Sequence, residues 1–306
     1  MNILFATDGS AHAHAAAATL QRLPVPTTST LTILTVITPT HLAMATDIDA
    51  LDREAFDRLY SIQRQAAEQL LAQTATGFET TDWTVRTMLR EGNVAQQIFD
   101  TIEELGTQLV VVGARGLSGM ARFFLGSVSQ KLVKYAPCSV LVGKLPHDEV
   151  STPTPSPTVS ADARLRMVLA YDDSASSQEI VHTLAALPLR DTDEITITTV
   201  LTLVTSYRLD IMQQLSAAWQ DEKRAAQDEL DRIAQILRDA TAAVVTTQLR
   251  EGADASEEIM TAAKEAEADL IVIGHRGRGS VERYLLGSVA NRVAHYAPCT
   301  VWVVRQ

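Results

Sequence analysis

The sequence is poor in several kinds of residue, and each scarcity excludes a class of protein. Only two cysteines occur among 306 residues, Cys138 and Cys299, and neither forms a CxxC pair, which excludes a disulfide framework. No apolar run reaches the roughly 18 residues that a membrane-spanning helix needs. No basic segment precedes the first apolar run, which argues against a signal peptide. We therefore expect a cytoplasmic protein that does not insert into a membrane.

Basic residues are also scarce relative to acidic ones. Lys and Arg number 26 against 37 Asp and Glu, a net charge of -11, and each half of the chain is acidic by itself. Such a balance does not favour binding to nucleic acid or to an anionic membrane surface. Hydrophobic residues make up 46% of the chain, which is typical of a globular protein, and its length suggests about two domains.

The chain repeats itself once. YAPCSVLV at 135–142 is answered by YAPCTVWV at 296–303, and the sequence LREG occurs at both 89–92 and 249–252. Gly113 and Gly274 open matching loops, and Asp8 and Asp172 each end an apolar run. Four matches in the same order indicate a tandem duplication of one domain of about 150 residues.

A segment without large apolar residues separates the two copies. It contains STPTPSPTVSAD and is rich in Pro, Ser and Thr, a composition typical of an extended, solvated tether. We therefore expect one domain at 1–146, a linker at 147–162 and a second domain at 163–306.

Each copy alternates strand-like and helix-like patterns. Short runs that are apolar on both faces suit the central strands of a parallel sheet covered by helices. The expected strands are 2–7, 31–38, 83–89, 108–112 and 139–143, then 166–171, 194–200, 244–250, 269–273 and 300–304. Helical patterns fill the gaps, and Asn93 and Asp254 each stand where a helix cap belongs. The prediction is an α/β fold: two tandem doubly wound, Rossmann-like domains, each a five-stranded parallel sheet with helices on both faces.

The loop after the fourth strand carries the strongest signal in each copy. It has the pattern G-x2-G-x9-G-S, from Gly113 to Ser127 and again from Gly274 to Ser288. Glycines permit close approach of a ligand to the backbone, and the start of a helix favours a phosphate. The alternative is that these are turn glycines with Ser127 as a helix cap. Neither G-x4-G-K-[ST] nor a full G-x-G-x-x-G occurs, which argues against a Walker loop and a dinucleotide oxidoreductase.

These residues resemble those of the universal stress protein family, in particular its tandem, nucleotide-binding members. The resemblance rests on Asp8-Gly9-Ser10 after the first strand, the duplicated glycine loop and the A-P-C phrase before the last strand. It covers nearly the whole chain and implies one ATP in each domain. By resemblance, an aspartate lies near the ribose and phosphates, the end of the second strand holds the adenine, and the loop holds the phosphates. The implied residues are Asp8, Val36, Gly113, Gly116, Gly126, Ser127, Ser129, Asp172, Val200, Gly274, Gly277, Gly287 and Ser288.

The second copy departs from the family pattern at two positions. Asp173 replaces the glycine that should follow Asp172, which we expect to add a carboxylate near an anion site, and Ala290 replaces the hydroxyl of Ser129. We therefore expect the first site to bind ATP more tightly. Arginines in the two loops suit a polyphosphate ligand, but they suit solvated loop charge equally well; they are Arg115, Arg122, Arg276, Arg278 and Arg283.

Other polar residues offer weaker signals. The seven histidines form no metal-binding spacing shared by the two copies, and Cys138 and Cys299 are better interpreted as small packing residues than as reactive thiols. Asp8 and Asp172 could hold Mg²⁺ with the nucleotide.

Three functions remain to be distinguished. We favour a non-enzymatic, ATP-dependent sensor or regulator of the stress response that acts on an unknown regulatory protein. The alternative is a slow Mg²⁺-dependent ATPase, although no water-positioning residue is visible in both copies. An adenylating ligase would need an acceptor-substrate domain, for which two repeats leave no room.

The last strand of each copy predicts how the domains associate. As exposed apolar edges, 140–142 and 301–304 should seek partners, and the family commonly pairs domains through this strand. We expect an internal pseudo-twofold dimer of the two domains, and leave open whether two chains form a homodimer.

Overall fold

The computed structural model describes residues 1–38, 50–117, 125–145, 164–202, 209–277 and 286–305, without the side chains of 50–56 and 209–217. The expected linker, 147–162, lies outside the described residues. The first half contains β1 (Asn2–Ala6), α1 (Ala11–Arg22), β2 (Thr30–Ile37), α2 (Ala50–Thr76), β3 (Thr84–Glu91), α3 (Val94–Leu105), β4 (Leu109–Gly113), α4 (Ser127–Tyr135) and β5 (Ser139–Gly143). The second half contains β6 (Arg166–Ala170), α5 (Ala175–Ala185), β7 (Glu194–Thr202), α6 (Leu209–Ala240), β8 (Val244–Gly252), α7 (Ala255–Glu265), β9 (Leu270–Gly274), α8 (Ser288–Tyr296) and β10 (Thr300–Val304).

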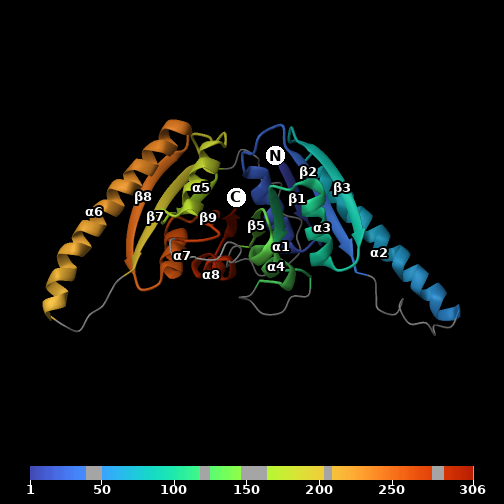
Figure 1. Cartoon of the computed structure of the whole chain (residues 1–306). Helices are drawn as coiled ribbons and strands as arrows, with labels where there is room; N and C mark the ends of the chain where they lie inside the picture. The colour runs from blue at the N-terminus through green and yellow to red at the C-terminus, as the bar shows by residue number, and fades with distance from the viewer. Residues whose placement is uncertain (39–49, 118–124, 146–163, 203–208, 278–285, 306) are drawn as a thin grey trace.

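The strands form one ten-stranded sheet in the order β3-β2-β1-β4-β5-β10-β9-β6-β7-β8. Within each half all neighbours are parallel, which confirms the predicted doubly wound fold. The two halves meet where β5 and β10 pair antiparallel, with Leu141 opposite Trp302. Figure 1 shows this seam at the centre of the molecule and the long helices α2 and α6 at its two far ends.

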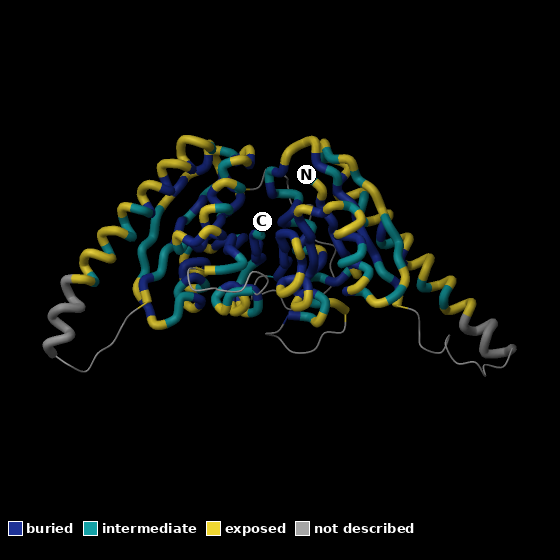
Figure 2. Tube along the Cα trace, in the orientation of Figure 1, coloured by how far each residue is buried: buried dark blue, intermediate teal, exposed yellow. Residues whose placement is uncertain are grey.

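Alternate side chains of the strands between the two outermost ones, β3 and β8, enter two separate cores, one on each face of the sheet. In β1, Ile3 and Phe5 pack against α1 and α2 on one face. Leu4 and Ala6 pack on the opposite face, in the core that contains residues of α3 and α4. Figure 2 shows the sheet buried between outer helices that expose one side. Burial on both faces explains why the strands read as continuous apolar runs.

Two helices begin at the caps that the sequence predicts. The side chain of Asn93 accepts a hydrogen bond from Gln96 N at the start of α3. Asp254 accepts hydrogen bonds from Ser256 N and Glu257 N at the start of α7. Both side chains satisfy N–H groups that the first helical turn cannot pair internally, so the cap predictions are confirmed.

Polar contacts across the seam follow the same pseudo-twofold relation as the strands. Lys144, just after β5, donates through Nζ to Ala297 O at 3.1 Å, at the end of α8. Arg305, just after β10, donates to Ala136 O at 2.6 Å and to Lys134 O at 3.1 Å, at the end of α4. Each half therefore places a basic side chain at the end of the other half's last helix, where it donates to carbonyl groups that the helix leaves unpaired. The expected internal pseudo-dimer is what the chain forms.

Among the helices that the structure describes, none is long and apolar enough to span a membrane.

Candidate functional site

Each half has a cavity where the carboxyl ends of its parallel strands meet. The first measures about 730 Å³ and is bordered by the ends of β1, β2 and β4, by α2 and α3, and by the start of α4. The second measures about 460 Å³ and is bordered by the ends of β6, β7 and β9, by α7 and by the start of α8. Both lie where ligands bind in doubly wound folds.

The turn after the first strand of each half is built the same way. Asp8 Oδ1 accepts a hydrogen bond from Ser10 N at 3.0 Å, and Asp172 Oδ1 accepts one from Ser174 N at 3.1 Å. The serine hydroxyl then donates to the loop after the fourth strand of its half, to Arg115 O at 3.0 Å or Arg276 O at 3.2 Å. These bonds hold one oxygen of each aspartate and fix the spacing of the two loops that border the cavity.

The second glycine of each loop is needed because the aspartate lies directly against it. A Cβ added at Gly116 would stand 2.6 Å from Asp8 Oδ2, and one added at Gly277 would stand 2.6 Å from Asp172 Oδ2. In each half, therefore, an aspartate carboxylate lies against the backbone of the glycine loop in the same way. Any side chain at these glycines would displace the carboxylate and fill the cavity.

The start of the last helix is uncapped in each half. Gly126 N donates to Ala114 O at 2.8 Å, and Gly287 N donates to His275 O at 2.8 Å, so the loop closes back on itself. Gly126 and Gly287 are the cap residues of α4 and α8, and no side chain of a described residue caps either helix with a hydrogen bond. Ser127 is therefore the first residue of α4 and not its cap, contrary to the structural alternative above. N–H groups of the first turn remain for an anion.

The first glycine of each loop has a reason other than the one predicted. A Cβ at Gly113 would stand 2.6 Å from Ala13 N in α1, and one at Gly274 would stand 2.7 Å from Ser176 Cβ in α5. Neither has a positive φ. These glycines let a helix pack tightly on the sheet, and they line the cavity only through their backbone.

The structure brings together all thirteen residues that the sequence and the family resemblance single out. Seven line the first cavity: Asp8, Val36, Gly113, Gly116, Gly126, Ser127 and Ser129. Six line the second cavity: Asp172, Val200, Gly274, Gly277, Gly287 and Ser288. Their contacts with a ligand remain a prediction.

The hydroxyl of Ser129 is already engaged with backbone carbonyl groups of the glycine loop. It donates to Gly113 O at 2.7 Å and to Ala114 O at 3.1 Å, and the residue is buried. A hydroxyl has one proton to donate, so it would have to break these bonds to donate to a phosphate. The change to Ala290 in the second half thus removes a bond that holds the loop, and the expected loss of a ligand contact does not follow.

Asp173 does not add a carboxylate to the second cavity. Its backbone has a positive φ of 57°, as Gly9 has at the matching position with 73°. The carboxylate accepts hydrogen bonds from Gln178 Nε2 at 3.0 Å and from Tyr171 Oη at 3.3 Å. Asp173 is not among the described residues that line the cavity, so the expected repulsion of an anion by this residue lacks support.

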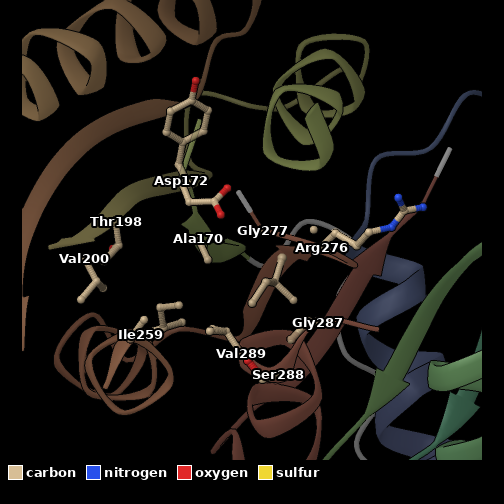
Figure 3. Close-up of a pocket in the computed structure, with 15 residues that line it drawn as sticks. Ala170, Asp172, Thr198, Val200, Ile259, Arg276, Gly277, Gly287, Ser288 and Val289 are labelled. Carbon is tan, nitrogen blue, oxygen red and sulfur yellow. The ribbon is translucent and has the colours of Figure 1, made fainter. Parts of the chain in front are cut away.

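The two described loop arginines, Arg115 and Arg276, both border a cavity, but the side chain of Arg276 does not point at the start of α8 (Figure 3). Figure 3 shows the guanidinium of Arg276 extending away from Asp172 and Ser288, toward ribbons of the chain's first half. Arg276 borders the cavity near its backbone, whose carbonyl oxygen accepts the bond from Ser174. Arg115 borders the first cavity. Arg122, Arg278 and Arg283 lie outside the described residues.

The histidines nearest the sites are held neutral. Burial, and then the charge of Arg276, lower the pKa of His275 to about 4, and its Nδ1 lies 3.2 Å from both Ser176 Oγ and Val304 O. Burial likewise lowers the pKa of His12. Among the described residues, no group of three or more His, Cys, Asp or Glu is arranged to hold a metal ion.

Two residues of the second cavity were not predicted. Tyr171 takes the position of Thr7, and Thr198 takes that of Leu34, since both pairs keep the same strand register. The hydroxyl of Thr198 is buried and has no hydrogen-bond partner among the described residues. Alignment of the two copies residue by residue around Asp8 and Asp172 would have exposed the first difference.

Comparison with known proteins agrees with this architecture. The sequence model of the Universal stress protein family matches residues 1–144 and 164–305. A universal stress protein of Mycolicibacterium smegmatis is 28% identical over 312 residues, covering 99% of this chain and 96% of that protein. One from Thermus aquaticus is 32% identical over 142 residues, covering 46% of this chain and 96% of its own length. The crystal structure of a universal stress protein from Archaeoglobus fulgidus has a TM-score of 0.57 at 20% identity, covering 99% of this chain and 98% of that one. The last similarity shows a shared fold.

Proposed function

Because the chain belongs to the universal stress protein family and carries its domain twice, we propose that it is a nucleotide-dependent regulator that binds ATP. ATP binds in the first cavity, and more weakly in the second. Occupancy then shifts the protein between states that a regulatory partner in the stress response distinguishes. A ligand can do this only by binding the two states unequally.

The observation that carries this proposal is the uncapped start of α4 opposite Asp8. The N–H groups of the first turn of α4 suit the phosphates, because they are donors at the positive end of the helix dipole. Leu34, Val36 and Ile37 at the end of β2 give the cavity apolar side chains suited to the adenine. A cavity of about 730 Å³ lies within the usual range for a nucleotide-sized ligand.

Binding without turnover is favoured over hydrolysis by the lining of the first cavity. Among its described residues Asp8 is the only carboxylate, and one of its oxygens is held by Ser10 N. Asp8 is the residue that would hold Mg²⁺ accompanying the phosphates, and the metal would neutralise their charge. Phosphoryl transfer to water also requires a residue that orients the water. Among the described lining residues Gln63 is of a type that can do so, but no second carboxylate or histidine accompanies it.

Calorimetry with ATP tests the proposal. We expect wild-type protein to bind ATP, Gly116→Trp to lose the tighter binding event, and Gly277→Trp to lose only the weaker one. Equal losses for the two variants would refute the ranking of the sites. Circular dichroism and melting curves of both variants serve as the folding control.

Two further measurements identify the ligand and the chemistry. Mass spectrometry of denatured, freshly purified protein should detect an adenine nucleotide. Incubation with ATP and Mg²⁺ should leave ATP intact over many binding lifetimes. Steady release of ADP that disappears in Asp8→Asn would instead support the slow ATPase.

A further inference from the structure

The two cavities differ at one end and agree at the other. At the glycine end, both are lined by an aspartate, two loop glycines and the uncapped start of a helix. At the opposite end, Thr7 follows β1 in the first half, whereas Tyr171 follows β6 in the second. The backbone positions correspond, since Thr7 N donates to Leu34 O at 2.9 Å and Tyr171 N donates to Thr198 O at 2.9 Å.

Tyr171 forms a wall between the second cavity and α6. The residue lines the cavity and is 3% exposed, its side chain packs in the core that α5 and α6 share, and its hydroxyl donates to Glu229 Oε1 on α6 at 2.7 Å. Burial, followed by the hydrogen bond to Glu229, raises the pKa of Tyr171, so the hydroxyl keeps its proton and this bond persists across the physiological range of pH. The wall is therefore held in place at both ends.

The two cavities differ in whether the long helix of their half, α2 or α6, contributes to the lining. In the first half, where Thr7 is small, α2 contributes four residues to the lining: Gln63, Ala66, Ala67 and Leu70. In the second half, no described residue of α6 lines the cavity. The first cavity therefore reaches its long helix, and the second ends at the tyrosine ring.

Thr198 supplies an independent sign that the second cavity takes a ligand of its own. The residue is 1% exposed, lines the cavity, and its hydroxyl has no hydrogen-bond partner among the described residues. Leu34 stands at the same position in the first half and is apolar. Buried hydroxyls are nearly always paired, so a ligand atom or a water must complete this one. Figure 3 shows Thr198 on the side of the cavity opposite Gly287 and Ser288.

We propose that the second cavity is a distinct site that Tyr171 makes selective for a phosphorylated compound smaller than a purine nucleotide. The phosphate occupies the start of α8, Tyr171 restricts the room for an adenosine and so weakens the binding of ATP, and Thr198 binds a polar group at the far end of the ligand. A pyrimidine nucleotide and a pentose phosphate share this chemistry. The proposal rests on the proposed function for the phosphate end and goes beyond it for the other.

The test isolates the second site and changes its wall. In the Gly116→Trp background, calorimetry compares ATP, UTP and ribose 5-phosphate before and after Tyr171→Thr, the residue that the first half has at this position. We expect UTP or ribose 5-phosphate to bind more tightly than ATP, and Tyr171→Thr to raise the affinity for ATP at least fivefold. The two smaller ligands distinguish a nucleotide site from a sugar-phosphate site.

Two matched variants separate the effect of the Tyr171 ring from the effects of the Tyr171 and Thr198 hydroxyl groups. Tyr171→Phe keeps the ring and loses the bonds of the hydroxyl to Glu229 and Asp173, so it should bind ATP as weakly as the unmodified second site does. Thr198→Val should lower the affinity for the preferred small ligand several-fold without increasing the affinity for ATP. Melting curves identify any variant that fails to fold, and Tyr171→Val, which also removes the ring, carries the same test if Tyr171→Thr is unstable.

Several outcomes would overturn the proposal. ATP binding by Gly116→Trp as tight as in the first site would do so, and so would an ATP affinity unchanged by Tyr171→Thr in a folded protein. Absence of binding by all three compounds would also reject it. Failure of ATP to bind wild-type protein would instead refute the proposed function, while binding of a smaller phosphate that depends on Thr198 would still support a separate second site.

Discussion

Lys144 at the seam should make the stability of the protein depend on pH in a way that a single substitution removes. The residue is 9% exposed, and its Nζ donates a hydrogen bond to Ala297 O at 3.1 Å across the seam. Burial lowers the pKa of Lys144 from 10.5 to about 7, with a smaller lowering effect from the charge of Arg115. The folded protein thus releases a proton that the unfolded chain keeps.

The sign and size of the effect follow from this difference. Between the folded pKa and the unfolded one, the unfolded state binds more protons, so the free energy of unfolding rises with pH and falls as pH drops toward 7. Near pH 7 the folded lysine is half protonated, which reduces the full slope of about 1.4 kcal/mol per pH unit to about 1 kcal/mol between pH 7 and 8. Higher pH adds an opposing effect, because burial raises the pKa of the Cys299 thiol to about 12.

Urea unfolding followed by circular dichroism measures this effect. We expect the free energy of unfolding of the wild type to increase by about 1 kcal/mol more than that of Lys144→Met when the pH is raised from 7 to 8. Lys134, which is exposed on α4, provides the control, and Lys134→Met should retain the wild-type dependence. An identical pH dependence in wild type and Lys144→Met would refute the buried, neutral lysine.

Three further predictions concern packing, a buried charge and the thiols. Gly143→Ala places a Cβ 2.3 Å from Ala16 Cβ, so it should lower the free energy of unfolding by about 1–3 kcal/mol or more, measured by urea unfolding. Asp193 is fully buried at 0% exposed and accepts hydrogen bonds from two backbone N–H groups and an arginine, so Asp193→Ala should cost about 3–5 kcal/mol in the same assay; a loss below 1 kcal/mol would contradict it. Burial raises the pKa of Cys138 to about 11 and that of Cys299 to about 12, so neither thiol should react with iodoacetamide at pH 8 until the protein is unfolded; rapid labelling of folded protein would show an accessible thiolate.

We still predict that the first site binds ATP more tightly than the second, but the structure supports this prediction for a different physical reason. From the sequence, the second site is weakened by the added carboxylate of Asp173 and by the loss of a hydroxyl at Ala290. The structure turns Asp173 toward Gln178 and engages the matching hydroxyl, that of Ser129, with backbone carbonyls. Tyr171 makes the second cavity smaller than the first, and this difference is the reason to expect weaker ATP binding in the second half.

Much of the architecture was predictable because it depends on local and repeated patterns. The duplication, the alternation of strands with helices, the caps at Asn93 and Asp254 and the grouping of the loop glycines around a cavity all follow from spacing along the chain. In a parallel sheet the carboxyl ends of the strands meet at one edge, so residues that follow different strands come together whatever their separation in sequence.

Tertiary structure alone decided where individual side chains point and what each glycine accommodates. Gly116 lies against a carboxylate, whereas Gly113 lies against the backbone of α1. The spacing of the two glycines along the chain does not reveal which of them has which role. The direction of Tyr171 depends on Glu229, 58 residues away, and that of Lys144 on Ala297, 153 residues away. Side-chain direction is set by partners brought close by folding, so the sequence determined which residues gather at the two cavities, and the packed structure determined that the cavities differ.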